Sequence, residues 1–142
     1  LGVFSSNAFH SLRVEDYIAC KFPDNIIMRI LALLHDSTES YLVDLPSPYK
    51  DLVYLMLPKG GMTKFADYET QLLRVIIKGL FPQSHLWNWE EQYHLVHEAD
   101  TAIKEQEIAK LLETGSLGNA YLSMVEVEKL FLDKFTELKN LL

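Results

Sequence analysis

Cysteine is nearly absent from this chain: Cys20 is the only one among 142 residues, so no internal disulfide can form. Its position on an apolar predicted helix indicates a buried thiol. No apolar run approaches the roughly 20 residues that a membrane-spanning helix needs, and no basic segment followed by an apolar leader is present. These absences predict a cytoplasmic protein without a membrane partner.

Positive charge is also scarce. The chain has 13 lysines and arginines against 20 aspartates and glutamates, which gives a formal net charge of −7. Duplex nucleic acid and anionic membranes both reward clustered basic side chains, so we expect neither as a partner. A small anionic substrate is compatible with this charge, because a metal ion inverts the local electrostatic field.

Sustained period-two alternation, internal repeats and low-complexity tracts are missing as well, which favours helices over strands. The hydrophobic content of 49% and the charged content of 23% are ordinary for a globular protein. We therefore predict an all-α fold, a compact bundle of about six helices, in a single domain over residues 1–142. Because the first residue is Leu1 rather than methionine, a truncated N-terminal segment is an open alternative.

Apolar spacing and helix breakers give the expected element boundaries. Helices are predicted over residues 10–22, 25–36, 48–57, 63–81, 89–113 and 120–141, with a short helical turn at 39–42. The helix over 48–57 is apolar on most sides, so we expect it to be buried. Asp24 or Asn25 is well placed to cap the second helix.

The most unusual stretch is residues 25–50, where an apolar helix ends in a group of ionisable residues. His35 and Asp36 stand side by side at the end of that helix, and Glu39, Asp44 and Lys50 follow. Charge beside an apolar helix is costly unless it is paired or coordinated to a metal. This group indicates the centre of a metal-dependent phosphohydrolase site.

Two further residues are candidates to complete a metal site with His35 and Asp36. His10 begins the first predicted helix, and Asp100 lies in the middle of a long one, beside Ala99. Taken singly, His10 is typical of a cap or surface residue, and Asp100 of a solvated or salt-bridged carboxylate. Taken as a set, the four offer mixed imidazole and carboxylate donors, which suit Mn, Fe, Co, Ni or Zn and less exclusively Mg.

The order His10, His35-Asp36, Asp100 resembles the H…HD…D signature of the HD-domain phosphohydrolase superfamily. More narrowly, LLHDSTESYLVDLPSPYK is similar to the segment HDxxExxxGDxPxxxK of bacterial HD-domain 5′-deoxynucleotidases and of related phage and bacterial nucleotide hydrolases. FHSLRVEDYIA resembles their AEHSLxVAxxA start, and LVHEAD resembles their late VKEAD or VKQAD motif. The resemblance spans roughly residues 4–112.

The resemblance implies roles for eight residues. The protein ligands of one divalent cation would be His10, His35, Asp36 and Asp100. Glu39 and Asp44 would be catalytic carboxylates that move protons to and from water and the leaving group. Lys50 would bind the substrate phosphate, as would His97, which replaces a lysine of the family and carries a weaker charge at neutral pH. Val43 replaces the glycine that usually precedes Asp44.

The resemblance also implies an activity. We expect a metal-dependent hydrolase of (deoxy)nucleotides, first of all a 5′-nucleotidase that releases phosphate from a deoxynucleoside monophosphate through a metal-activated water. Two alternatives stay open: a deoxynucleoside triphosphate triphosphohydrolase, and a non-catalytic nucleotide-sensing module. Members of the family assemble as dimers or larger rings, so we expect a homo-oligomer.

Overall fold

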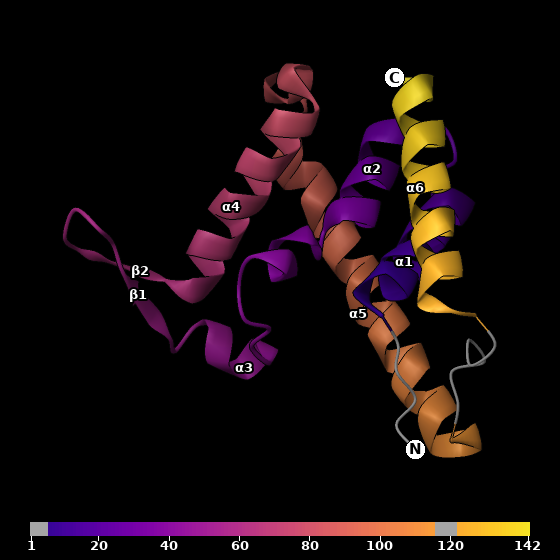
Figure 1. Ribbon diagram of the computed structural model, residues 1–142, viewed down its shortest axis with the longest axis horizontal. Coiled ribbons are helices and arrows are strands. Elements are labelled where there is room, and N and C mark those ends of the chain that lie inside the picture. Colours follow the sequence, from indigo (N-terminus) through magenta and orange to yellow (C-terminus); the bar gives the residue numbers. More distant parts are fainter. Residues whose placement is uncertain (1–5, 116–121) are drawn as a thin grey trace. The chain divides into compact units, whose positions relative to one another are not determined.

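The computed structural model describes residues 6–115 and 122–142 of the chain. Within these ranges lie six α-helices, two short 3-10 helices and one antiparallel hairpin (Figure 1). The α-helices are α1 (Asn7–Lys21), α2 (Ile26–Leu34), α3 (Ser47–Lys50), α4 (Phe65–Leu80), α5 (Trp89–Thr114) and α6 (Met124–Leu141). The 3-10 helices are η1 (Ser37–Ser40) and η2 (Pro82–Leu86), and the strands are β1 (Tyr54–Met56) and β2 (Met62–Lys64). The predicted mostly helical fold is confirmed.

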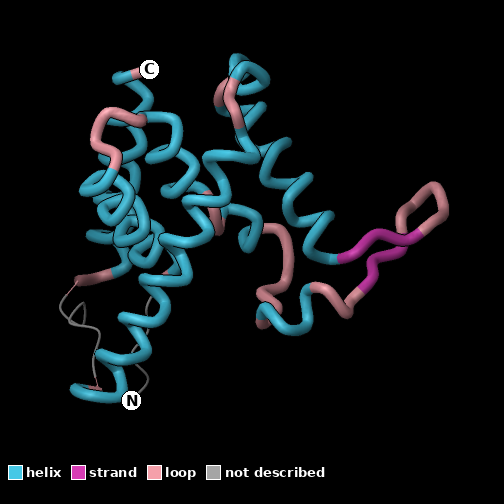
Figure 2. Tube along the Cα trace, turned by 180° about the vertical axis from the view of Figure 1, so that it is seen from behind, coloured by secondary structure: helices cyan, strands magenta, loops and turns pink. Residues whose placement is uncertain are grey.

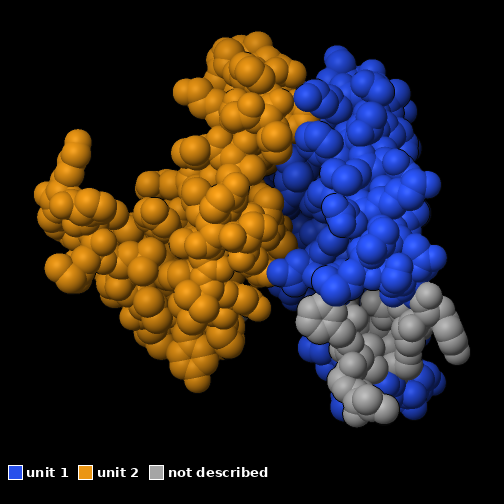
Figure 3. Space-filling view, in the orientation of Figure 1, with its two compact units in different colours: residues 1–35, 88–142 blue, residues 36–87 orange. Residues whose placement is uncertain are grey.

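The chain divides into two compact units, which Figure 3 shows in blue and orange. The first unit contains residues 1–35 and 88–142, and therefore α1, α2, α5 and α6. The second contains residues 36–87, with η1, α3, the hairpin, α4 and η2. The boundary falls between His35 and Asp36, within the stretch that the sequence marks as unusual.

Four helices build the core of the first unit. Helices α1 and α2 pack on each other, and each also contacts α5 and α6 (Figures 1 and 2). Helix α2 contributes a nearly continuous buried run: Ile30, Leu31, Ala32, Leu33 and Leu34. Since each buried leucine or isoleucine of this run contributes about 1.5–3 kcal/mol, the run anchors the helix and with it the residue that follows, His35.

Local signals in the sequence explain where these helices begin and end. The Ser6 hydroxyl accepts a hydrogen bond from the Phe9 backbone N–H at 3.2 Å and begins α1. Asn25, rather than Asp24, caps α2, because its side-chain oxygen accepts from the Met28 backbone N–H at 3.0 Å. Helix α5 stops at Gly115, whose φ of +69° is a left-handed conformation that glycine adopts without strain.

A buried ion pair ties α1 to α2 inside this unit. Glu15 has no exposed surface, and Arg29 Nε donates a hydrogen bond to its Oε1 at 2.7 Å. Lys134 on α6 places its ammonium 4.0 Å from the other carboxylate oxygen. Burial raises the pKa of Glu15, and the neighbouring Arg29 and Lys134 only partly offset that rise. Three helices therefore meet around one carboxylate.

The second unit corrects the predicted helix over residues 48–57 and the predicted absence of strands. Helix α3 ends at Lys50, and β1 follows it, pairing with β2 so that Tyr54 faces Lys64. The segment is not buried either: Met56 on β1 is 84% exposed. A short apolar run does not distinguish helix from strand, because its periodicity is too brief to measure.

The turn between the strands explains why this segment folds as a hairpin. Gly60 and Gly61 have φ values of +87° and +89°, a region that favours glycine. The Gly60 N–H donates to the Leu57 carbonyl, and the Leu57 N–H donates to the Gly61 carbonyl, both at 3.0 Å. This closed turn reverses the chain, which the apolar pattern before it does not predict.

The predicted burial of Cys20 is also wrong, since this residue is exposed on α1. The buried face of α1 follows Val14 and Ile18, and Cys20 comes two positions after Ile18, away from that face. In the described part of the chain, no helix combines the length and the apolar character that a membrane span requires.

Candidate metal centre

The first unit brings His10, His35 and Asp100 together from three helices. His10 lies in the first turn of α1, His35 directly follows α2, and Asp100 lies near the middle of α5. Their exposed fractions are only 7%, 8% and 6%. Polar side chains buried among apolar helices need hydrogen-bond partners, and these three side chains lie close enough to supply them to one another.

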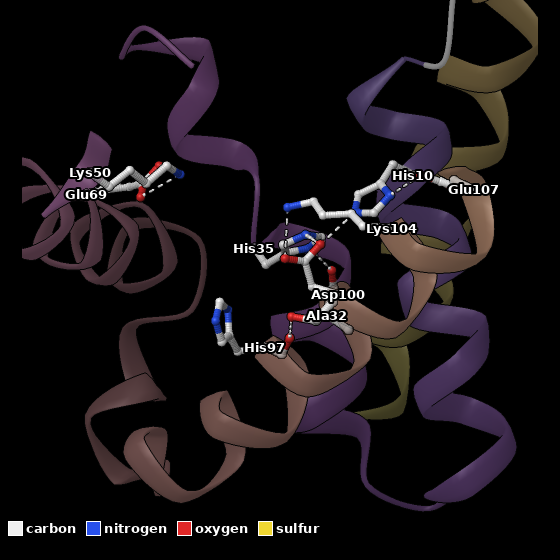
Figure 4. Close-up of polar contacts among 10 residues, drawn as sticks. His10, Ala32, His35, Lys50, Glu69, His97, Asp100, Lys104 and Glu107 are labelled. Atoms are coloured by element: carbon white, nitrogen blue, oxygen red, sulfur yellow. Dashed lines mark hydrogen bonds and ion pairs between the residues drawn. The ribbon is translucent and has the colours of Figure 1, made fainter. Parts of the chain in front are cut away.

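Asp100 contacts both histidines of this group. Its Oδ1 lies 2.8 Å from His10 Nε2 and 3.4 Å from His35 Nε2, and the two imidazole rings have centroids 5.5 Å apart (Figure 4). Its Oδ2 accepts a hydrogen bond from Lys104 Nζ at 2.9 Å, one helical turn further along α5. Both oxygens of the carboxylate are therefore engaged, and one of them lies against both histidines.

The electrostatics of the group keep Asp100 ionised. Burial alone would raise its pKa, but hydrogen bonds with His10 and His35, the charge of His35 and the contact with Lys104 together hold the pKa far below the ordinary value of 3.8. A carboxylate that stays charged while buried is a good ligand for a divalent cation, because it does not have to lose a proton first.

Asp36 completes the cluster that could hold a metal ion. One donor atom from each of His10, His35 and Asp36 can be chosen so that all three lie within 4.8 Å of one another. Asp36 is half-buried and follows His35 directly in the chain, as the first residue of the second unit. With Asp100, the donor set is two imidazoles and two carboxylates, which fits a divalent transition metal and less exclusively Mg²⁺.

The orientation of His35 supports this assignment. His35 Nδ1 lies 2.7 Å from the Ala32 carbonyl oxygen, which can only accept, so Nδ1 carries the proton. Nε2 is then the ring nitrogen that could offer a lone pair to a cation, and it is Nε2 that faces Asp100, at 3.4 Å from Oδ1. The helix backbone therefore turns Nε2 of this histidine toward the cluster, as a ligating histidine would require.

Three neighbours of the cluster were not identified from the sequence: Arg13, Lys104 and Glu107. Glu107 is buried, and its Oε2 accepts from His10 Nδ1 at 3.1 Å, while Arg13 Nη1 donates to its Oε1 at 3.0 Å. The spacing could have indicated Lys104 and Glu107, because they follow Asp100 by four and seven residues and so share one face of the helix with it. Arg13 similarly follows His10 by one turn.

The other four predicted site residues are Glu39, Asp44, Lys50 and His97. Glu39 is half-buried in η1, where its N–H donates to the Asp36 carbonyl at 3.0 Å, and Asp44 is exposed after η1. Lys50 donates to both carboxylate oxygens of Glu69 on α4, at 2.9 and 3.0 Å (Figure 4). His97 is exposed on α5, three residues before Asp100.

Of the four predicted metal ligands, the structure brings donor atoms of His10, His35 and Asp36 within 4.8 Å of one another and places Asp100 against both imidazoles. Glu39, Asp44 and Lys50 belong to the second unit, and their catalytic and phosphate-binding roles stay predictions. Comparison of the chain with protein-family models, with curated proteins and with solved structures found no match.

Proposed function

We propose that this protein is a metal-dependent phosphohydrolase of nucleotides, and specifically a 5′-nucleotidase that releases phosphate from a deoxynucleoside monophosphate. The observation that carries the proposal is the convergence of His10, His35 and Asp36 within 4.8 Å, with Asp100 against both imidazoles. These are the residues that the HD-domain resemblance would assign to one divalent cation.

Each ligand has a defined task in this proposal. Asp100 holds the positive charge with a carboxylate that is already ionised, and Lys104 keeps its second oxygen engaged. His35 presents Nε2 because its Nδ1–H is donated to Ala32. A cation bound by this set would supply a water of lowered pKa and a Lewis acid for a phosphoryl oxygen.

The remaining roles fall to residues of the second unit and to His97. Glu39 would orient or deprotonate the attacking water, and Asp44 would protonate the leaving alkoxide. Lys50 would bind the phosphate, which requires that its ammonium exchange Glu69 for the substrate. His97, exposed one turn before Asp100, would add a hydrogen bond to the substrate.

A nucleotide panel tests the proposal directly. The purified chain is incubated with deoxynucleoside mono- and triphosphates in Mn²⁺, Co²⁺, Zn²⁺ or Mg²⁺, and products are identified by mass. We expect orthophosphate and a deoxynucleoside from a monophosphate, abolished by chelation and by Asp36→Ala. The matched control is Asp133→Ala, since Asp133 is exposed on α6 and contributes to no cluster described above.

The outcomes separate the alternatives. Tripolyphosphate from a deoxynucleoside triphosphate would assign a triphosphohydrolase, which uses the same ligands on a different bond. Tight nucleotide binding without any product would assign a sensing module. Hydrolysis that survives Asp36→Ala or exhaustive chelation would contradict a metal-dependent reaction altogether.

A further inference from the structure

His10 lies between two carboxylates of the same helix. Its Nε2 contacts Asp100 Oδ1 at 2.8 Å, and its Nδ1 contacts Glu107 Oε2 at 3.1 Å (Figure 4). Asp100 and Glu107 are seven residues apart on α5, two helical turns, so both project from one face of that helix. The ring is therefore held at both nitrogens.

Glu107 is itself fixed by α1. Arg13 Nη1 donates to Glu107 Oε1 at 3.0 Å, so the carboxylate uses one oxygen for the guanidinium and the other for His10. Glu107 is 9% exposed, and a carboxylate buried to this extent is costly unless it is compensated. Arg13 supplies that compensation from one turn beyond His10, and this leaves Glu107 committed to a single orientation.

We propose that Glu107 is a positioning residue that sets the tautomer of His10 for metal binding. In the metal-bound state Nε2 would give its lone pair to the cation instead of a proton to Asp100, and Glu107, a carboxylate that can only accept, would hold the ring proton on Nδ1. Arg13 holds Glu107 in place and balances its charge, which prevents the carboxylate from turning into the cluster as a ligand. The inference rests on the metal site of the proposed function and adds Glu107 and Arg13 to it.

In both histidines Nδ1 faces an oxygen acceptor, but the two acceptors differ. His35 donates its Nδ1–H to the Ala32 backbone carbonyl at 2.7 Å, and His10 donates its Nδ1–H to a side chain. A charged acceptor raises the basicity of the opposite nitrogen more than a neutral carbonyl does. Of the two imidazoles, His10 is therefore the one whose affinity for a cation depends on a replaceable residue.

The first test needs no variant. The chain is titrated with Zn²⁺ alone, which is diamagnetic, and the ring nitrogens of His10 are assigned by ¹⁵N-detected or long-range ¹H–¹⁵N NMR. We expect a protonated Nδ1 and a zinc-bound Nε2. Zinc on Nδ1 of His10 would overturn the role of Glu107.

The second test measures zinc affinity by calorimetry in Glu107→Ala, Glu107→Gln and Arg13→Ala. We expect Glu107→Ala to weaken binding by roughly 10- to 100-fold, as for other carboxylates that support a ligating histidine. Glu107→Gln should retain part of the affinity, because its amide oxygen still accepts from Nδ1–H, and Arg13→Ala should give a smaller loss. Glu105→Gln is the control, because Glu105 is exposed on the same helix.

The two proposals fail in different ways. A wild-type chain that binds no zinc overturns the metal site of the proposed function and the role of Glu107 with it. Wild-type affinity in a folded Glu107→Ala variant overturns the role of Glu107 alone, because the metal site is then intact. Circular dichroism of each variant shows whether it is folded.

Discussion

His10 and Asp100 are 90 positions apart in the chain, yet His10 Nε2 and Asp100 Oδ1 lie 2.8 Å apart. The contact joins α1 to α5 in the interior of one unit, where a hydrogen bond to a charged group is stronger than at the surface. The same two side chains are candidate ligands of one cation. Substitutions here should therefore change both folding stability and metal binding, and the two effects can be separated by pH and by metal.

Asp100→Asn should weaken the fold and change its response to acid. Burial alone would raise the pKa of Asp100, but His10 and His35 hold it far below 3.8. A carboxyl with a lowered folded-state pKa contributes stability above its unfolded pKa, and this contribution is lost as the pH falls through the folded-state value. The wild type should therefore lose stability below about pH 4, and the variant should lose less.

Urea unfolding at neutral and acid pH measures both parts of this prediction. At pH 7, Asp100→Asn should lower the free energy of unfolding by about 1–3 kcal/mol, since hydrogen bonds to a charged group are lost. Asp133→Asn, on the exposed side of α6, should change it little. Equal losses on acidification in the wild type and in Asp100→Asn would contradict the assigned electrostatics.

Divalent metal should stabilise the chain against heat. A ligand that binds only the folded state adds about 2.7 kcal/mol at one hundred times its Kd, so Zn²⁺ or Mn²⁺ should raise the melting temperature and chelation should reverse the rise. Asp36→Ala should remove most of this shift. An undiminished shift in that variant would assign the binding to surface histidines such as His85 and His94.

Most of the helical framework was predictable because its signals are local. Helices α1, α2, α4, α5 and α6 were expected within a few residues of their observed bounds, since apolar spacing and breakers such as Pro23 and Gly115 mark them. The segment 48–57 was not, because a brief apolar run fits either structure and the outcome depends on the turn at Gly60 and Gly61.

The candidate site was predictable in part for a different reason. The four predicted metal ligands were found from their resemblance to an ordered pattern of residue types; in the structure His10, His35 and Asp36 form a cluster that could hold a metal ion, and Asp100 contacts His10. Glu107 and Arg13 carry no such pattern, and glutamate and arginine are usually surface residues. Only the packing of α1 against α5, a long-range contact, turns them into partners of His10.

Glu15 should show the opposite pH behaviour to Asp100. Burial raises its pKa, so its contribution to stability is complete below the unfolded-state value of 4.5 and is lost as the pH rises through the folded-state value. Glu15→Ala should cost about 3–5 kcal/mol at neutral pH, because Arg29 then has no compensating carboxylate at 2.7 Å. Denaturant unfolding across pH checks both the size and the sign.

A double variant separates the charge of Glu15 from its packing. Glu15→Leu combined with Arg29→Met removes both charges and keeps apolar volume, so it should recover much of the stability that Glu15→Ala loses. A double variant as unstable as Glu15→Ala would show that the hydrogen bonds of the pair, including that from Arg29 to the Pro23 carbonyl, matter more than charge burial.

Lys50 and Glu69 form an ion pair, and substituting each residue in turn tests whether the pair has a role in catalysis. Their side chains are 23% and 21% exposed, so breaking the pair should cost less than about 1 kcal/mol of stability. If Lys50 binds the substrate phosphate, Lys50→Ala should raise KM roughly 10-fold or more with little change in kcat, since one charged hydrogen bond to the substrate is lost. Glu69→Gln should lower KM, because the ammonium no longer has a carboxylate competing with the phosphate. Lys59→Ala, in the exposed hairpin turn, is the matched control. An unchanged KM in Lys50→Ala would contradict a role in phosphate binding and would leave the ion pair a structural role in the second unit.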